Sequence, residues 1–339
     1  MRTRTRLAAL VAVAMVATAA VLAGTSLAQT GRAQATSACL VTDVGGLNDK
    51  SFNHLAFVGL QAAEKTGVEG RVIESMSGAD YIPNLLSCVQ GGADLTIGVG
   101  FLMADAINTV AVRFPNSKFA IIDFSYADLA GKPANVRGIL FREQESGYLA
   151  GWLAVKELML QKKKLVLGAV GGLKIPPVDH YIAGYIAGAK AANKSAKVLY
   201  GYSQNFVDQA KCKEVALGQI AQGSQVEFAV AGQCGLGALD AAKEKGGWGI
   251  GVDADQLYLG AHMLTSAIKK VDVGVSRTIK SVVDGNFHGF GNTIFSVRAG
   301  GAGIGAISKK VPKSLVTQEK TLEKQLKSGK VKGIPTTVP

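Results

Sequence analysis

Short apolar runs alternate with longer amphipathic stretches between residues 37 and 253. The short runs are rich in Val, Ile and Leu, which is typical of strands that are buried on both faces of a sheet. We expect such strands at 38–42, 71–74, 95–99, 119–123, 139–142, 165–170, 198–202, 226–231 and 248–252.

The stretches between these runs have the period of helices with one apolar face. They predict helices at 52–65, 81–90, 103–114, 145–160, 181–193, 211–222 and 236–245. Regular alternation of strand and helix predicts an α/β protein with parallel sheets and helices on both faces. After residue 253 the pattern changes. It predicts helices at 261–270 and 275–285, an extended segment at 294–298, a turn and glycine-rich strand at 300–305, and a basic helix at 317–327.

The alternating pattern runs twice, with a seam near residues 135–145. We therefore expect two doubly wound parallel-sheet lobes joined by a hinge of more than one crossover. The N-terminal lobe would comprise 36–141 plus about 255–288, and the C-terminal lobe 142–254 plus about 289–339. Open α/β sheets bind ligands beyond the carboxyl ends of their strands, so we expect a ligand in the cleft between the lobes.

Residues 1–35 have the features of a signal peptide. Arginines precede an apolar run at 7–22, and small residues lead to cleavage sites after Ala28 or Ala35. The alternative, a retained membrane anchor, conflicts with the length of the run, because a spanning helix needs about 20 apolar residues. The segment predicts export to the outer face of the cytoplasmic membrane, the periplasm or the cell envelope.

Basic residues outnumber acidic ones, 37 to 25. Four of the arginines lie in the predicted signal peptide, so the mature chain would carry a net charge of about +8. The surplus is spread over helix ends and the C-terminal tail, with no basic stripe interleaved with aromatic residues. This distribution argues against nucleic acid as a partner and favours solubility near an anionic surface.

Four cysteines in an exported chain favour disulfides. Three pairings are possible, and we prefer Cys39 with Cys88 and Cys212 with Cys234, because each pair stays within one half of the chain. Four buried free thiols are the alternative. Cys39 lacks the preceding Leu of a lipidation signal and opens an apolar strand, so we expect no lipid on it.

Polar residues follow the first predicted strand at the corner that leads into the first helix. Asp49 and Ser51 suit helix capping. Asp43 and Asn53 face the predicted cleft and can reach a ligand there. Phe52 fits either a core position or an aromatic platform for a ligand.

Two further carboxylates, Asp123 and Asp253, end apolar strands in different halves. Carboxylates around a cleft suit a ligand rich in hydroxyl groups, because ionised oxygens accept strong hydrogen bonds. Glycines at 232, 235 and 237 follow another strand with neither the dinucleotide spacing nor a P-loop, so we expect close approach of backbone amides to the ligand.

The sequence has no catalytic motif. The histidines, at 54, 180, 262 and 288, show no metal-binding spacing, and there is no serine elbow or reactive-cysteine context. We expect neither enzymatic activity nor a cofactor or metal.

Several segments resemble the basic membrane protein family, whose best-understood members are PnrA-like purine nucleoside receptors. The resemblance begins in the corner at 43–53 and continues, in the family's order, at 141–151, 171–176, 231–237, 251–256 and 265–269. It spans nearly the whole mature chain. One departure is the missing lipidation motif, since many relatives are lipoproteins.

This resemblance implies the type I periplasmic-binding-protein fold and a role for each matching residue. Phe52 and Phe206 would sandwich a purine ring, and Asn53 and Asp123 would address the base. The residues near base or ribose would be Asp43, Gly232, Asp253 and Lys269.

The function predicted from these features is that of a monomeric ABC importer receptor. It would bind a small molecule, a purine nucleoside, and deliver it to a membrane permease and its ATPase, meeting the membrane surface through the permease. The alternatives are a sugar or polyol receptor of the same fold, a sensory binding protein without a permease, and an exported enzyme.

Overall fold

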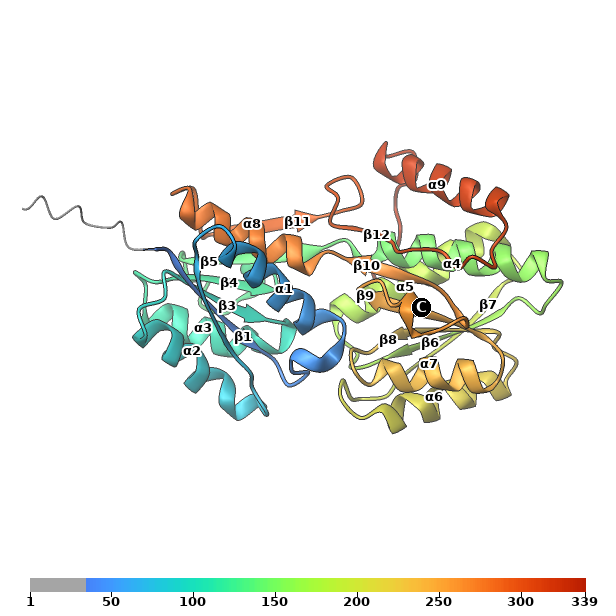
Figure 1. Ribbon diagram of the computed structural model, residues 1–339, viewed down its shortest axis with the longest axis horizontal. Helices are drawn as coiled ribbons and strands as arrows, with labels where there is room; N and C mark the ends of the chain where they lie inside the picture. Colours follow the sequence, from blue (N-terminus) through green and yellow to red (C-terminus); the bar gives the residue numbers. More distant parts are fainter. Residues whose placement is uncertain (1–34) are drawn as a thin grey trace, which may run out of the picture. The chain divides into compact units, whose positions relative to one another are not determined.

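Two six-stranded sheets form the framework of residues 35–339, the part of the chain that the computed structural model describes (Figure 1). Residues 1–34 of the predicted signal peptide, including the cleavage site at Ala28, lie outside the described residues. In both sheets the strands are short, and their central members are completely buried. The near-continuous apolar runs of the sequence therefore correspond to strands covered on both faces.

The first sheet has the strand order β11-β5-β4-β3-β1-β2, and all of its neighbouring strands are parallel. Its strands are β1 (Ser37–Thr42), β2 (Glu69–Ile73), β3 (Leu95–Val99), β4 (Lys118–Ile122), β5 (Val136–Phe141) and β11 (Gly291–Phe295). Two apolar clusters fill its two faces. One face is covered by α1 (Phe52–Glu64) and α8 (Val271–Val283), the other by α2 (Tyr81–Gln90) and α3 (Ala104–Arg113).

The second sheet has the order β12-β10-β9-β8-β6-β7 and is parallel except for β12. Its strands are β6 (Val166–Gly171), β7 (Lys197–Tyr202), β8 (Val226–Val230), β9 (Trp248–Asp253), β10 (Met263–Lys269) and β12 (Ala302–Ile304). One face is covered by α4 (Glu143–Leu160) and α5 (Pro176–Ala192), the other by α6 (Gln209–Ala221) and α7 (Gly235–Glu244). The last helix, α9 (Lys313–Lys327), contacts α4.

Helices α4 and α5 approach each other closely, and this contact positions part of the cleft. A Cβ atom at Gly184 would lie 2.1 Å from the carbonyl oxygen of Gln144, so only glycine allows this approach. The contact brings the first turn of α4, which contains Glu143, close to the first turns of α5, which contain Tyr181.

The strands and helices predicted between residues 37 and 253 are all confirmed, with ends that differ by a few residues. The expected helix at 261–270 is wrong, because Met263–Lys269 forms β10. Every residue of β10 is buried. The segment therefore has no solvent-facing side, and an apolar run of this length fits a buried strand or a helix equally well.

The expected assignment of the tail to the lobes also differs from the strand pairing. Residues 255–288 were expected in the first lobe, yet β10 pairs with β9 in the second sheet, and only α8 covers the first. Residues 289–339 were expected in the second lobe, yet β11 pairs with β5 in the first sheet. The chain thus crosses between the sheets after β5, after β10 and after β11.

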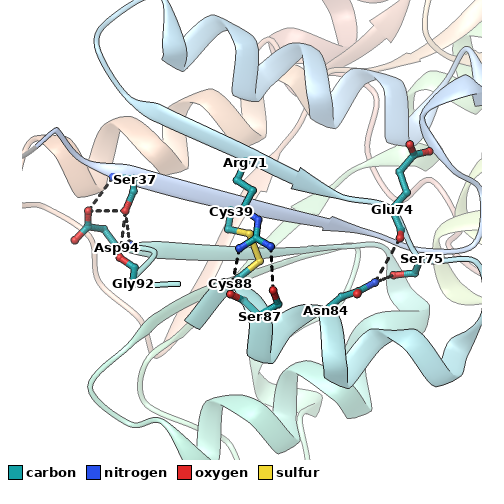
Figure 2. The surroundings of a disulfide bond; sticks show 10 residues. All are labelled: Ser37, Cys39, Arg71, Glu74, Ser75, Asn84, Ser87, Cys88, Gly92 and Asp94. Carbon is teal, nitrogen blue, oxygen red and sulfur yellow. Dashed lines mark hydrogen bonds between the residues drawn. A yellow bond between two sulfur atoms is a disulfide. The ribbon is translucent and has the colours of Figure 1, made fainter. Parts of the chain in front are cut away.

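Both preferred disulfides are present, one beside each sheet. Figure 2 shows Cys39 of β1 bonded to Cys88 of α2, while Arg71 of β2 donates hydrogen bonds to the Oγ and carbonyl oxygen of Ser87. This bond ties the first strand to the helix that covers it. Because its sulfur is bonded to Cys88, Cys39 has no free thiol.

Candidate functional site

The corner after β1 is built around the carboxylate of Asp43. Its Oδ1 accepts hydrogen bonds from the Gly45 amide (3.0 Å) and from Asn53 Nδ2 (2.8 Å). Burial raises the pKa of Asp43, and these two hydrogen bonds oppose the rise. The contact also fixes the Asn53 amide, because only its nitrogen can donate to a carboxylate.

Asp49 caps α1, as the sequence predicts. Its carboxylate accepts from the backbone amides of Ser51 (3.0 Å), Asn53 (2.7 Å) and His54 (3.1 Å). Ser51 occupies the N-cap position of α1, but its side chain makes no capping bond. Its hydroxyl points instead toward the second lobe, because Asp49 has already satisfied the first amides of the helix.

Asp253 ends β9 and lies across the cleft from α1. Its Oδ2 accepts from Ser51 Oγ (2.8 Å) and its Oδ1 from Tyr181 Oη (3.0 Å). The Asp253 backbone is left-handed, with φ 61°. Burial raises the pKa of Asp253, whereas the charge of Lys269 lowers it. The sequence suggested Asp253 as a ligand-binding residue because it ends a strand. In the structure its carboxylate also joins the two lobes.

Lys269, at the end of β10, is the buried cation of the site. Its ammonium group forms ion pairs with Asp123 Oδ2 and with Glu143 Oε1 (3.2 Å), and it lies 4.8 Å from the centroid of the Phe52 ring. Glu143 in turn contacts His180 Nδ1 through its other oxygen (3.1 Å). The positive charge is thus shared between two carboxylates and an aromatic face.

For both Asp123 and Lys269, the effect of burial on the pKa is opposed by the charge of the other residue. Burial raises the pKa of Asp123 to about 7, although Lys269 lowers it. For Lys269, burial lowers the pKa, but the charges of Asp123, Glu143 and Asp253 outweigh it and raise the pKa above its usual range. Lys269 therefore stays charged, and its charge favours an ionised Asp123.

These residues line one cavity between the lobes, and its empty space is about 630 Å³ when the part open to solvent is included. All eight residues singled out from the sequence lie in its wall, namely Asp43, Phe52, Asn53, Asp123, Phe206, Gly232, Asp253 and Lys269.

Other residues of the site were not predicted from the sequence. Tyr181 lines the cavity from α5, and Glu143 pairs with Lys269 from α4. Gly100 also lines it, and a Cβ there would lie 2.7 Å from Asp43 Oδ2 and 3.4 Å from the Phe52 ring. The position of Gly100 directly after strand β3 was the only available signal.

The loop after β8 forms the wall of the cavity in the second lobe. Gly232 has a left-handed backbone (φ 53°), and the Cys234 amide donates to the carbonyl oxygen of Phe206 (2.9 Å). The bond between Cys234 and Cys212 holds the start of α7 against α6. Phe206 and Gly232 are therefore fixed together at the rim of the second sheet.

The arrangement is suited to holding a ligand. It presents aromatic rings, buried oxygens and one cation, Lys269. Among the described residues, no cluster of three or more His, Cys, Asp or Glu side chains could hold a metal ion. Within residues 35–339 we find no helix long and apolar enough to cross a bilayer.

A family model described as "ABC transporter substrate-binding protein PnrA-like" matches residues 36–336. The sequence is 34% identical over 291 residues to the ABC transporter nucleoside-binding protein BmpA of Lactococcus lactis, covering 79% of this chain and 81% of that protein. It is 36% identical over 238 residues to basic membrane protein A1 of Borrelia garinii, covering 69% and 68%.

A solved structure supports the same grouping. The crystal structure of an ABC transporter solute-binding protein from Aeropyrum pernix superposes with a TM-score of 0.78 at 28% sequence identity, covering 88% of this chain and 94% of that one. The two parallel-sheet lobes and their interleaved crossovers are thus those of the type I periplasmic-binding fold.

Proposed function

The chain belongs to the family of PnrA-like substrate-binding proteins of ABC transporters, and from that premise we propose that it binds a purine nucleoside between its lobes. In this proposal it is the receptor of an importer and delivers the nucleoside to the permease and its ATPase. The relative from L. lactis is described as nucleoside-binding, which supports the assignment.

The observation that carries the proposal is the pair of aromatic side chains in one cavity. Phe52 enters from α1 of the first lobe, and Phe206 from the loop after β7 of the second. Stacking contributes about 1–3 kcal/mol per base. Charge-assisted hydrogen bonds from ribose hydroxyls to carboxylates such as Asp43 add about 1.5–3 kcal/mol each. Together these terms reach the roughly 8 kcal/mol of a micromolar complex.

We further propose that the nucleoside leaves the site unchanged. The buried carboxylates are held by Asn53, Ser51, Tyr181 and Lys269. The Ser51 hydroxyl donates to Asp253, and Ser51 is not one of the residues that line the cavity. Chromatography of nucleosides after long incubation with the protein should return them intact. Released free base would instead identify a hydrolase.

Membership of this family implies that the protein acts outside the cytoplasm. We propose that the protein acts as a monomer at the outer face of the cytoplasmic membrane. Any membrane anchor must lie elsewhere than on Cys39, whose sulfur is bonded to Cys88.

Calorimetry tests the proposed ligand. We expect micromolar or tighter binding of purine nucleosides and no detectable heat with ribose or galactose. Phe206→Leu should weaken nucleoside binding about tenfold through lost stacking. Phe290→Leu is the matched control, because Phe290 is exposed and outside the cavity. Tight binding of a sugar, with none of a nucleoside, would replace the proposal by the sugar receptor.

A further inference from the structure

The last helix, α9, carries its lysines on the side opposite to its packed side. The packed side contacts α4 and consists of four buried residues, Leu315, Glu319, Leu322 and Leu326. An α-helix turns by about 100° per residue, so residues spaced seven, four and three apart share one side. Four exposed lysines have this spacing and form what we call the lysine face: Lys313, Lys320, Lys324 and Lys327.

Most of the surplus positive charge of the chain lies on and around this face. Residues 309–332 contain eight lysines and two glutamates, so they carry a net charge of +6, out of about +8 for the mature chain. Glu319 is buried on the packed side, and Glu323 pairs with Lys327 (2.8 Å). Arg298 adds a cation at the C-terminal end of α9, where its Nε donates to the carbonyl oxygen of Lys327 (2.8 Å).

The chain itself does not neutralise these charges. Within residues 35–339, Lys327 is the only one of the eight lysines that forms an ion pair. A helix that shows four to eight lysines to solvent is suited to an anionic membrane surface, where each lysine strengthens binding about fivefold. Proteins of this family act outside the cytoplasm with the membrane subunits of a transporter, and Cys39 has no free thiol to carry a lipid.

We propose that the lysine face of α9 binds the headgroups of anionic phospholipids and holds the receptor reversibly at the membrane surface. The attachment is electrostatic, because the apolar residues of α9 are packed against the second lobe and are not free to enter a bilayer. No residue of α9 lines the cavity between the lobes, so the membrane and the ligand occupy separate parts of the protein. The inference therefore holds for any ligand of the cavity.

Sedimentation of the mature chain with lipid vesicles tests the proposal. We expect binding to vesicles of phosphatidylglycerol mixed with phosphatidylcholine, and none to phosphatidylcholine alone. Binding should disappear at 1 M salt, because the Debye length falls from about 10 Å at 0.1 M to about 3 Å. Replacing all four lysines of the face by Gln should weaken binding to the mixed vesicles at least about a hundredfold, and Lys320→Gln with Lys324→Gln roughly twentyfold.

The matched control removes the same charge from exposed lysines elsewhere and should bind the mixed vesicles as the wild type does. Its changes are Lys65→Gln, Lys118→Gln, Lys211→Gln and Lys245→Gln.

Three results would overturn the proposal. If the wild type stays in the supernatant with mixed vesicles at 0.1 M salt, the protein does not bind such membranes. Equal losses in the control and in the variant of the lysine face would mean that only net charge matters. Binding of soluble polyphosphate without binding of vesicles would assign the face to another polyanion. If the fourfold variant does not fold, the double variant decides between α9 and the control surface.

Discussion

Glu227 is a buried carboxyl group, and burial is the main influence on its pKa. It lies in β8 with 1% of its surface exposed, and neither of its oxygens has a hydrogen-bond donor. Gln219 Oε1 also lacks a donor, and the two side chains meet above Gly168, where a Cβ would lie 2.4 Å from Glu227 and 2.5 Å from Gln219. Burial raises the pKa of Glu227 to about 8. At neutral pH it therefore keeps its proton, which provides a donor for this cluster.

Glu227 should make the protein less stable as pH rises. Its pKa is 4.5 without burial and about 8 in the fold, so between these values the native state binds more protons than the unfolded state. Stability then falls as pH rises through this window and levels off above about pH 8. Glu227→Gln keeps a donor and removes the ionisation, so its melting temperature should exceed that of the wild type at pH 8 and converge with it near pH 5.

Differential scanning calorimetry from pH 5 to pH 9 checks this prediction. Glu214→Gln, an exposed glutamate on α6, should melt like the wild type throughout. Parallel curves for Glu227→Gln and the wild type would mean that Glu227 is ionised in the fold.

The carboxylates of the site that could be predicted from the sequence all lie at the ends of apolar strands. Asp43, Asp123 and Asp253 directly follow or end apolar strands, and the carboxyl ends of such strands meet at the cleft. Glu143 and Tyr181 lie in helices, and only the packing of α4 against α5 brings them to the site. The hydrogen bond from Ser51 was not predicted for a similar reason, because its partner Asp253 belongs to the other lobe.

At the scale of elements, regular alternation is what made the fold predictable. Up to β9, α-helices connect successive strands, except that only a short 3-10 turn at Tyr126–Asp128 lies between β4 and β5. Each predicted strand or helix therefore supports the assignment of the next. After β9 this regularity ends. A run such as Met263–Lys269 then has no neighbouring pattern to decide between strand and helix, and its burial on all sides removes the amphipathic signal.

The two disulfides close loops of different length, and their removal should have unequal effects on stability. Their sequence separations are 49 residues for Cys39–Cys88 and 22 for Cys212–Cys234. Loop entropy predicts a loss of about 4 kcal/mol for the first and about 3 kcal/mol for the second when each pair is replaced by Ala. Denaturant unfolding of the two double variants measures both losses.

The second double variant should also affect the site. Cys234 directly follows the cavity residues Gly232 and Gln233, so loss of its bond to Cys212 should weaken nucleoside binding. The first disulfide lies away from the cavity and serves as the internal control. Equal affinity in both variants would show that the loop keeps its position without the bond.

At the scale of the whole molecule, the two lobes contact each other directly, through hydrogen bonds between protein groups. Ser51 of the first lobe donates to Asp253 of the second, and both are buried. The carbonyl oxygen of Lys50 also accepts a long hydrogen bond from Gln256 Nε2 (3.5 Å). These contacts stabilise the closed arrangement of the lobes, and a hinge opening would break them.

Ser51→Ala should shift the ligand-free protein toward an open form. Small-angle scattering should show a larger radius of gyration for this variant without ligand, and the same contracted value as the wild type at saturating nucleoside. Affinity should fall about tenfold, because the ligand must then supply the closing energy. Ser328→Ala, at an exposed position after α9, should behave as the wild type. Identical scattering of both variants with and without ligand would contradict closure by this contact.

The interleaved tail determines when the first lobe can fold during synthesis. Its sheet needs β11, whose Gly291 pairs with Arg137 of β5, and its α1 face needs α8. Pairings between residues so far apart in the chain form slowly. A ribosome must therefore complete most of the polypeptide before the first lobe can close its core. Such a delay keeps the nascent chain unfolded for translocation, so the order of the strands favours secretion first and folding afterwards.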